Sequence, residues 1–388
     1  MCVHTGYAVR QNGVNGFYTY IYTGMAQQTL NFKPPKQVIV LLSLFMLIIL
    51  VVCFRQSPTL VEKYYYGGFY QVVCHILHPV LNRLPHSFGD LAYIFVIILT
   101  LIGAYHLIRF LFTRQYKKAG KLALRFLICL QIGWLWFYCF WGLNYYRPPA
   151  AQLLHLNDTT YTIKDVAKVT ALIIDSANAL RASLDRADLS DYDPATYAYA
   201  TVAVISLNRL SDKFRTVIPR VKPSMFSSLL NYMGTSGYYN PFTGEAQLNY
   251  QMPLFDKPFV ACHEMGHQTG WAREDEANFA GYLAGVHSVG RMVRYSAYYA
   301  GIEEFMRYLR RRDTAAHHAL RLRISPLVYK DFKTDSAYWT KYQGATEVVS
   351  GLFFDKFLKA NNQPHGLRTY NRMILLTMAY YRTKERVW

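Results

Sequence analysis

The sequence predicts a chain of two parts, an N-terminal region of three transmembrane helices and a mainly helical α+β domain with a small sheet. Three long apolar runs within the first 143 residues predict the membrane part. Apolar residues at helical spacing and one short alternating segment predict the second part. A length of 388 residues accommodates a membrane portion and one globular domain.

The N-terminal part begins with residues 1–37, which contain no long apolar run. Their Gly, Asn and Thr content predicts a flexible tail rather than a cleavable signal peptide. Transmembrane helices are then expected at about residues 38–54, 91–112 and 122–143, and the first of these runs carries no charge. The third run is rich in aromatic residues towards its end, which suits a membrane interface: Trp134, Trp136, Tyr138 and Trp141.

Basic residues predict the orientation of these helices, because cytoplasmic loops are enriched in Lys and Arg. Six basic residues and no acidic residue lie between the second and third runs: Arg109, Arg114, Lys117, Lys118, Lys121 and Arg125. With this loop in the cytoplasm, three crossings place the N-terminus inside and residues 55–89 and 144–388 outside. The bilayer is thus one predicted partner of the chain.

The net charge of +18 is unevenly distributed along the chain. Residues 1–143 hold 12 of the 42 basic and 2 of the 24 acidic residues, which leaves 30 minus 22, or +8, for residues 144–388. Much of the excess is therefore explained by membrane topology. No basic patch with interleaved aromatics on a recognisable module is present, so no nucleic-acid partner is expected.

The outer domain, residues 144–388, is predicted to be mainly helical. Residues 162–186 carry apolar side chains at helical spacing, with Thr162 and Asp165 placed to cap the start. Asp193 and Pro194 are a suitable cap and first-turn pair for a helix that runs to about Phe214. Residues 246–250 alternate between Gly244 and Pro253, which predicts a short strand.

The motif with the clearest chemistry is HExxH at residues 263–267. With about 3.6 residues per turn, His263 and His267 project from one helix face and can share a metal ion. Glu264 then lies beside the metal and can hold a water molecule. This spacing is the signature of zinc metallopeptidases and predicts a zincin-like domain that binds Zn²⁺.

A third protein ligand is needed, because a catalytic zinc ion normally has three plus a water molecule. The extended pattern HExxHxxGxxH is excluded, since Arg273 occupies its third histidine position. A carboxylate from a following helix is the other solution. Glu274 is favoured over Glu276, which lies roughly 200° away around that helix, although the sequence leaves Glu276 open. Asn278, one turn after Glu274, is expected to hydrogen-bond the outer nitrogen of a ligating histidine.

Three stretches around this motif resemble domain-of-unknown-function family 3810, whose members are bacterial membrane proteins with an HExxH core. They are residues 237–247 (GYYNPFTGEAQ), 258–264 (PFVACHE) and 273–279 (REDEANF). The resemblance extends over most of the chain from the first membrane run to Tyr370. It implies a Gram-negative cell, in which the outer domain is periplasmic and the chain is integral to the inner membrane.

A more distant resemblance links the spacing of Glu274, Ala277 and Asn278 to the ExxAD ligand helix of integral-membrane CAAX-processing and heat-shock endopeptidases. In this chain Asn278 replaces the aspartate of that pattern.

Taken together, these residues predict metal-assisted hydrolysis of amide bonds in a peptide or protein substrate. Zinc held by His263, His267 and Glu274 acidifies a water molecule, and Glu264 takes its proton and returns it to the leaving amine. The alternative is a zinc-fold scaffold or binding protein of the cell envelope without turnover, against which an intact Glu264 argues.

Several residues near the motif are weaker candidates. Three tyrosines could stabilise an oxyanion or bind substrate: Tyr238, Tyr239 and Tyr370. Glu245 is explained equally well by capping or ion pairing. By resemblance to zinc peptidases in general, the strand at residues 246–250 is expected to form the edge that pairs with an extended peptide, with a plain hairpin strand as the other interpretation.

Overall fold

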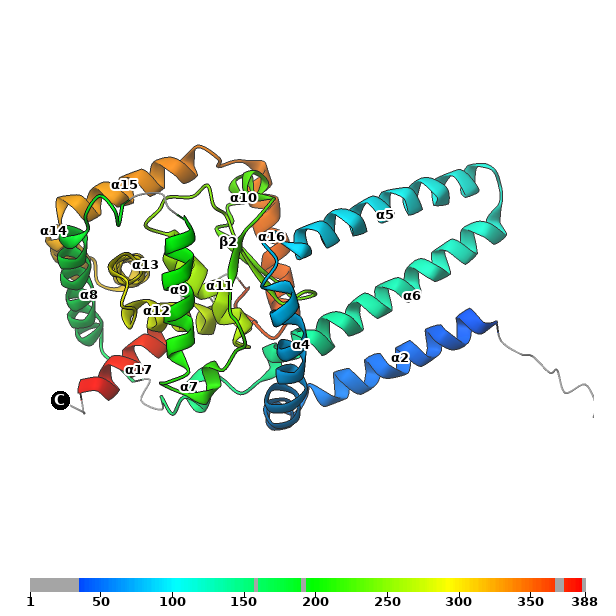
Figure 1. The fold of residues 1–388 in the computed structure, drawn as a ribbon, viewed down its shortest axis with the longest axis horizontal. Coiled ribbons are helices and arrows are strands. Elements are labelled where there is room, and N and C mark those ends of the chain that lie inside the picture. The colour runs from blue at the N-terminus through cyan, green and yellow to red at the C-terminus, as the bar shows by residue number, and fades with distance from the viewer. Residues whose placement is uncertain (1–34, 157–159, 190–192, 367–372, 386–388) are drawn as a thin grey trace, which may run out of the picture.

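Three long helices and a mainly helical body make up the structure, a computed structural model that describes residues 35–156, 160–189, 193–366 and 373–385. The long helices are α2 (Lys36–Phe54), α5 (Phe88–Phe112) and α6 (Tyr116–Phe140), and they extend from one end of the body (Figure 1). All three are long and apolar enough to cross a membrane. The third begins earlier than predicted, because its basic first turns are also helical. Most of the predicted flexible tail lies outside the described residues.

These three helices, called the membrane helices below because they could cross a bilayer, alternate in direction, so that the end of α2, the start of α5 and the end of α6 all adjoin the body (Figure 1). Helix α6 packs against both α2 and α5. The turn between α5 and α6, which carries the basic residues, lies at the far end of this bundle. Residues 55–87 and the body therefore lie on the same side of the membrane helices.

The segment between α2 and α5 is folded onto the body. It consists of α3 (Pro58–Leu60), the π-helix η1 (Val61–Tyr70) and α4 (Gln71–Leu81). Tyr65, Tyr66 and Tyr70 are buried in an aromatic cluster that includes Trp141 at the end of α6. The Tyr70 hydroxyl donates to the main-chain oxygen of Gln268 at 3.2 Å. A segment expected only as an outer loop is thus part of the body, beside the HExxH helix.

The body begins with the 3₁₀-helix η2 (Gly142–Tyr146) and contains eleven described α-helices. In chain order these are α7 (Ala150–Leu153), α8 (Ile163–Ser183), α9 (Asp193–Leu207), α10 (Ser227–Tyr232), α11 (Lys257–Gln268), α12 (Glu274–Val286), α13 (Arg291–Arg312), α14 (Thr314–Arg323), α15 (Pro326–Thr340) and α16 (Ala345–Ala360), followed by α17 (Met373–Glu385) as the last helix.

The predicted start of the helix at residue 162 is confirmed by α8, whereas the predicted end of the next helix differs from that of α9. Thr162 and Asp165 form a capping box, in which each side chain bonds the main chain of the other. Helix α9 ends at Leu207, and a separate 3₁₀-helix, η3 (Asp212–Phe214), follows it. The predicted single helix to Phe214 is therefore wrong, because the chain turns at residues 208–210 before η3 begins.

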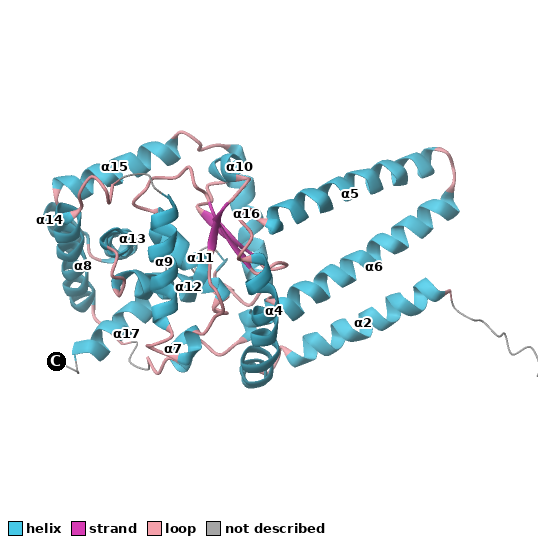
Figure 2. Cartoon of the chain, viewed as in Figure 1, coloured by secondary structure: helices cyan, strands magenta, loops and turns pink. Residues whose placement is uncertain are grey.

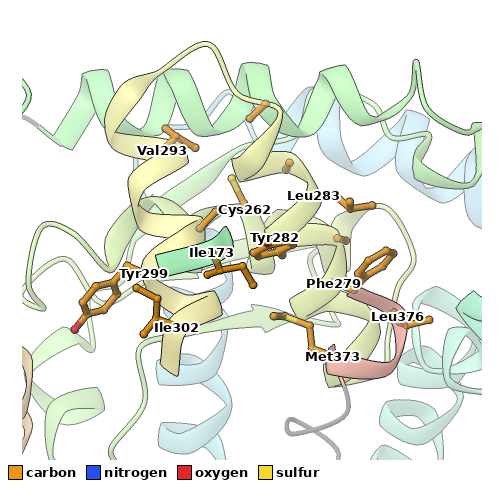
Figure 3. Close-up of a cluster of buried hydrophobic side chains, with 14 of the residues drawn as sticks. Ile173, Cys262, Phe279, Tyr282, Leu283, Val293, Tyr299, Ile302, Met373 and Leu376 are labelled. Atoms are coloured by element: carbon orange, nitrogen blue, oxygen red, sulfur yellow. The ribbon is translucent and has the colours of Figure 1, made fainter. Parts of the chain in front are cut away.

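The main hydrophobic core lies between α8, α9, α11, α12 and α13. Ile173 of α8, Cys262 of α11 and Tyr282 of α12 are fully buried in it (Figure 3). Two small residues bring the helices close together: a Cβ at Gly285 would lie 2.3 Å from that of Ala297, and the α12–α13 contact therefore requires glycine. Within this packing, α11 contacts α9, α12 and α13.

A small sheet lies between this helical core and the membrane helices (Figure 2). Its strands are β1 (Val221–Pro223), β2 (Gly237–Asn240) and β3 (Glu245–Leu248), in the order β1-β3-β2. Strand β3 pairs in parallel with β1 and antiparallel with β2. The expectation that β3 forms the free edge is therefore wrong, since both of its edges are occupied and β2 is an edge strand instead.

Candidate metal centre

Helix α11 carries the HExxH motif and is buried along most of its length. Asp256 precedes the helix and Pro258 lies in its first turn, where a missing N–H costs nothing. The helix ends before Gly270, whose φ of +88° is a left-handed conformation that favours glycine. His263 and His267 lie one turn apart, and their ring centroids are 4.8 Å from each other. The predicted pair on one helix face is present.

Helix α12 approaches α11 very closely through small residues. A Cβ at Gly281 would lie only 3.0 Å from the main-chain nitrogen of His263. On the facing side, a Cβ at Gly266 would lie 3.4 Å from that of Ala280. Because of this approach, the first residue of α12 lies directly against the histidines of α11.

That first residue is Glu274. Its Oε2 lies 3.3 Å from Nε2 of His263 and 3.6 Å from Nε2 of His267. One potential ligand atom from each of the three residues lies within 4.8 Å of the others, and all three residues are buried. In the part of the chain that the structure describes, this is the one group of at least three His, Cys, Asp or Glu residues with such spacing.

Glu276 faces a different part of the molecule. Its Oε1 accepts a hydrogen bond from the main-chain N–H of Ala150 at 2.8 Å and pairs with Nη1 of Arg273 at 3.2 Å. These contacts attach the start of α12 to Ala150, at the start of α7. The structure therefore brings Glu274, and not Glu276, to the two histidines.

Glu264 is buried beside this group, with 4% of its surface exposed. Strand β2 passes directly over it, because a Cβ at Gly237 would lie 2.8 Å from its Oε1. No described residue donates a hydrogen bond to its Oε2. The pKa of Glu264 is raised to about 7, mainly by burial; the negative charge of Glu274 contributes to this rise, and His263 and His267 oppose it. A buried carboxylate with an unsatisfied oxygen is costly, which is typical of a functional group.

The charges of the three clustered residues are mutually dependent. Burial by itself would raise the pKa of Glu274, but the neighbouring histidines hold it well below its ordinary value. Burial lowers the pKa of His267, and Glu274 together with Glu264 more than reverses this effect. The site thus favours an ionised Glu274 opposite positive charge, which a cation could supply in place of the histidine protons.

The orientation of His267 is fixed from outside the cluster by a main-chain group. Its Nδ1 lies 2.7 Å from the carbonyl oxygen of Trp271, which leaves Nε2 directed towards Glu274. Asn278 was expected to make this type of contact, but among the described hydrogen bonds none joins it to either histidine. The carbonyl of Trp271 is the outer partner of His267 because the chain reverses at Gly270.

The reversal at residues 269–271 is supported by Arg147, which the sequence did not indicate. Its Nη1 donates to the carbonyl oxygen of Gly270 at 2.8 Å, and its Nε donates to Glu62 at 2.7 Å. The guanidinium lies 3.3 Å from the ring centre of Tyr66 and 4.7 Å from that of Trp271. The π-helix between the first two membrane helices therefore contributes to the position of His267.

The membrane helix α6 contacts the HExxH helix as well. Trp141, the residue after α6, donates from its indole nitrogen to the carbonyl oxygen of His267 at 3.3 Å. Its ring also packs against that of Tyr239, with centroids 4.7 Å apart. The cluster of potential ligands therefore lies at the side of the body from which the membrane helices extend.

The candidate tyrosines lie in different places. The ring of Tyr239 lies beside the cluster, with its centroid 5.9 Å from that of His267, but its hydroxyl lies next to Gly244 and Tyr70, and burial raises its pKa so that it stays protonated. Tyr238 points away and its hydroxyl donates to Asp90 in the first turn of α5. Tyr370 lies outside the described residues.

Glu245 has a structural role. Its Oε1 pairs with the buried Nζ of Lys222 at 2.5 Å, and its Oε2 accepts from the main-chain N–H of Gly89 at 2.6 Å. The carboxylate thus caps the start of α5, where a negative charge is favourable. Glu245 therefore caps a helix and forms an ion pair with Lys222, as one of its two interpretations predicted.

The chain was compared with known proteins in three ways. Neither the curated proteins nor the solved structures include a match to it. Residues 65–378 match the model of a family described as "Protein of unknown function (DUF3810)". This match covers most of the chain, including the second half of η1, the sheet and both helices of the candidate site, and it agrees with the resemblance found in the sequence. The chain belongs to the family DUF3810.

Proposed function

We propose that this protein is a membrane-anchored, zinc-dependent peptidase that hydrolyses amide bonds in a peptide or protein substrate. His263, His267 and Glu274 hold the zinc ion, and Glu264 acts as general base. The observation that carries the proposal is the spacing of the three ligand atoms next to a buried carboxylate that has an unsatisfied oxygen.

The donor set fits a zinc ion in both chemistry and spacing. Two imidazole nitrogens and one carboxylate oxygen are a common catalytic set, completed by water. Two ligand atoms that are each about 2.0–2.1 Å from a tetrahedral zinc ion lie about 3.4 Å apart. The separations of 3.3 Å and 3.6 Å between Glu274 Oε2 and the histidine nitrogens match this value. A zinc ion supplies a Lewis acid that polarises a carbonyl group and lowers the pKa of water.

Glu264 performs the proton transfers. Its carboxylate lies one residue after His263 and is enclosed between α11 and β2, where water is largely excluded. In the ionised form it accepts a proton from the attacking water, and it then donates this proton to the nitrogen of the leaving amine. A pKa raised to about 7 by burial suits a group that must both accept and donate a proton near neutral pH.

The geometry of β2 supports an extended chain as the substrate. Asn249 donates from its main-chain N–H to the carbonyl oxygen of Ser236, so in this antiparallel register Tyr238 and Asn240 face β3. Gly237 and Tyr239 then direct their main-chain groups away from the sheet. A peptide strand could pair with these groups directly beside Glu264, with little dependence on its side chains.

We further propose that the body lies in the periplasm, with the N-terminus and the α5–α6 turn in the cytoplasm. The basic residues of that turn, which lies at the far end of the bundle, support this orientation. The intact Glu264 argues against a scaffold without turnover, because such a protein does not need a buried carboxylate with an unsatisfied oxygen at this position.

The test is to measure the zinc content of purified wild-type protein and its cleavage of an unbiased peptide library in the same preparation. We expect one zinc ion per chain and cleavage that stops when a chelator removes the metal. Stoichiometric zinc without any cleavage would favour the scaffold. Absence of zinc after purification and reconstitution with the metal would exclude the assigned site.

A further inference from the structure

Three elements beside the membrane helices present apolar side chains that no other described part of the chain covers. On α4, Ile76 and Val80 are 61% and 63% exposed. On α10, Leu229 and Tyr232 are 52% and 53% exposed. On α16, Leu352 and Phe353 are 61% and 75% exposed. We name these exposed side chains of α4, α10 and α16 the apolar collar.

Each element of the collar is attached to the body-facing end of a membrane helix. Helix α4 lies in the segment that joins α2 to α5. Beside α10, the main-chain N–H of Met225 donates to Oδ2 of Asp90, in the first turn of α5, at 2.7 Å. At the end of α16, the side-chain oxygen of Asn361 accepts from the Tyr138 hydroxyl of α6 at 2.9 Å. The collar therefore surrounds the place where the membrane helices join the body.

Helix α16 carries four of these exposed apolar side chains. Of its described residues only Leu358 is buried. Val348, Val349, Leu352 and Phe353 are separated by one, three, four or five positions and so occupy one side of the helix. Helices α16 and α4 both run across the direction of the membrane helices, at the end of the body from which those helices extend (Figure 1). A helix with exposed apolar side chains on one side, in this position, is suited to lie in the plane of a membrane surface.

The geometry points to the lipid surface as the partner of the apolar collar: α4, α10 and α16 rest on the bilayer around the membrane helices. An uncovered apolar face of this extent is unfavourable in water, at about 25 cal/mol for each Å². The collar lies at the level where α2, α5 and α6 would leave the hydrocarbon region. A second copy of the chain would have to cover three separate elements that surround the membrane helices, whereas a bilayer around these helices meets all three at once.

This contact would hold the candidate metal centre at the membrane surface. Trp141 follows α6 directly and bonds the carbonyl oxygen of His267, so the HExxH helix cannot lie far from the end of the membrane helix. Gln363, just after α16, accepts from the main-chain N–H of Glu274 at 3.1 Å. If the proposed peptidase activity is correct, on which this step rests, the substrate is a segment of chain beside the membrane. The lipid contact itself does not depend on that activity.

Photo-crosslinking in proteoliposomes tests the lipid contact without any need for turnover. Benzoylphenylalanine is introduced at position 353 or 229, in the collar, or at position 322 as the control. Leu322 is also an exposed apolar helix residue, 88% exposed on α14, but α14 lies at the opposite end of the body. The liposomes contain a phosphatidylcholine with a clickable group on its acyl chain, and the adduct is quantified per protein chain.

We expect on the order of ten-fold more lipid adduct at positions 353 and 229 than at 322, because only the first two would be in the interface. Equal labelling at all three positions would overturn the proposal. A protein adduct of twice the chain mass at 353 and 229, in place of lipid adduct, would overturn it in favour of a second copy. Because zinc content and peptide cleavage are measured separately, failure of the peptidase proposal leaves this result unaffected.

Discussion

The indole nitrogen of Trp141 lies 3.3 Å from the main-chain carbonyl oxygen of His267 and donates a hydrogen bond to it. Trp141 is the residue that follows membrane helix α6, and His267 is the last histidine of the HExxH motif. A single side chain, that of Trp141, therefore links the end of α6 to the helix of the candidate metal centre. The compartment of the site is consequently the compartment into which the end of α6 emerges.

The first prediction concerns that compartment. Alkaline phosphatase fused after Trp388 should be active, because we place the body in the periplasm, where this enzyme folds. The same reporter inserted in the turn at residues 113–115 should be inactive, since the basic residues there favour the cytoplasm. Colony phosphatase activity, normalised to fusion abundance, gives the measurement. The reverse pattern would move the site into the cytoplasm.

The second prediction separates the two carboxylates at the start of α12. Glu274→Gln should weaken zinc binding severely, because an anionic oxygen that lies 3.3 Å from the His263 nitrogen is replaced by a neutral amide. Glu276→Gln is the matched control. It should leave zinc affinity nearly unchanged and cost about 1 kcal/mol of stability through the weaker contacts to Arg273 and Ala150. Competition with a chelator ranks the variants, and release of zinc by Glu276→Gln alone would disprove the ligand assignment.

The third prediction concerns Arg147 as a positioning residue. Arg147→Lys keeps the positive charge but cannot bond Glu62 and the Gly270 carbonyl in the same geometry. The reversal that holds Trp271 against His267 should loosen, and zinc affinity should fall by about 10-fold or more, as for other outer partners of metal ligands. Asn278→Ala is the comparison. It should change zinc affinity by less than about two-fold, because no described hydrogen bond joins Asn278 to either histidine, whereas loss of a true outer partner costs far more.

Both variants are measured by chelator competition after thermal unfolding has established that they are folded. Equal losses of zinc affinity in Arg147→Lys and Asn278→Ala would contradict this assignment. They would return the role of outer partner to Asn278.

The fourth prediction uses the pH dependence of stability. Burial raises the pKa of Glu303 from its ordinary 4.5 to about 7, and the nearby Asp335 adds to this effect while Arg307 opposes it. Between these two values the folded state holds a proton that the unfolded chain has lost, so the free energy of unfolding decreases as pH rises from about 4.5 to 7. Glu303→Gln should therefore be more stable than the wild type at pH 8.

The gain is at most about 3 kcal/mol, because each pKa unit corresponds to about 1.4 kcal/mol and Glu303 is only half-buried. It should vanish near pH 4, where both forms are neutral. Thermal unfolding in detergent at both pH values gives the measurement. A difference between variant and wild type that does not change with pH would show that Glu303 does not titrate in this window.

Much of the candidate site could be predicted because its geometry is local. The positions of His263, Glu264 and His267 relative to one another follow from helix periodicity alone. Glu274 required one further step, the choice of a helix face. That choice agrees with the structure because Gly281 and Gly266 allow the two helices to approach closely, which brings the first residue of α12 against the histidines of α11.

The contacts that the sequence did not indicate join residues far apart in the chain. Arg147 and Gly270 are 123 positions apart, and Trp141 and His267 are 126 apart. Strand β1 is three residues long and ends in a proline, so it has no alternating pattern to detect. Without β1, the order of the strands could not be predicted, and for this reason β3 was placed at the edge instead of β2.

The apolar surface of α4 illustrates a different limit. Its apolar residues at helical spacing are visible in the sequence, but the same pattern is expected for a helix that packs on a protein core or on lipid. Only the position of α4 relative to the membrane helices distinguishes these two interpretations.

The central claim is tested most directly by the rate at which Glu264→Gln hydrolyses a peptide that the wild-type protein is known to cleave. We predict that the variant retains zinc, since Glu264 is not among the three clustered ligand residues, and that its rate falls by at least about 100-fold, because an amide cannot accept a proton. A zinc-loaded Glu264→Gln protein that cleaves this peptide at the wild-type rate would contradict the account.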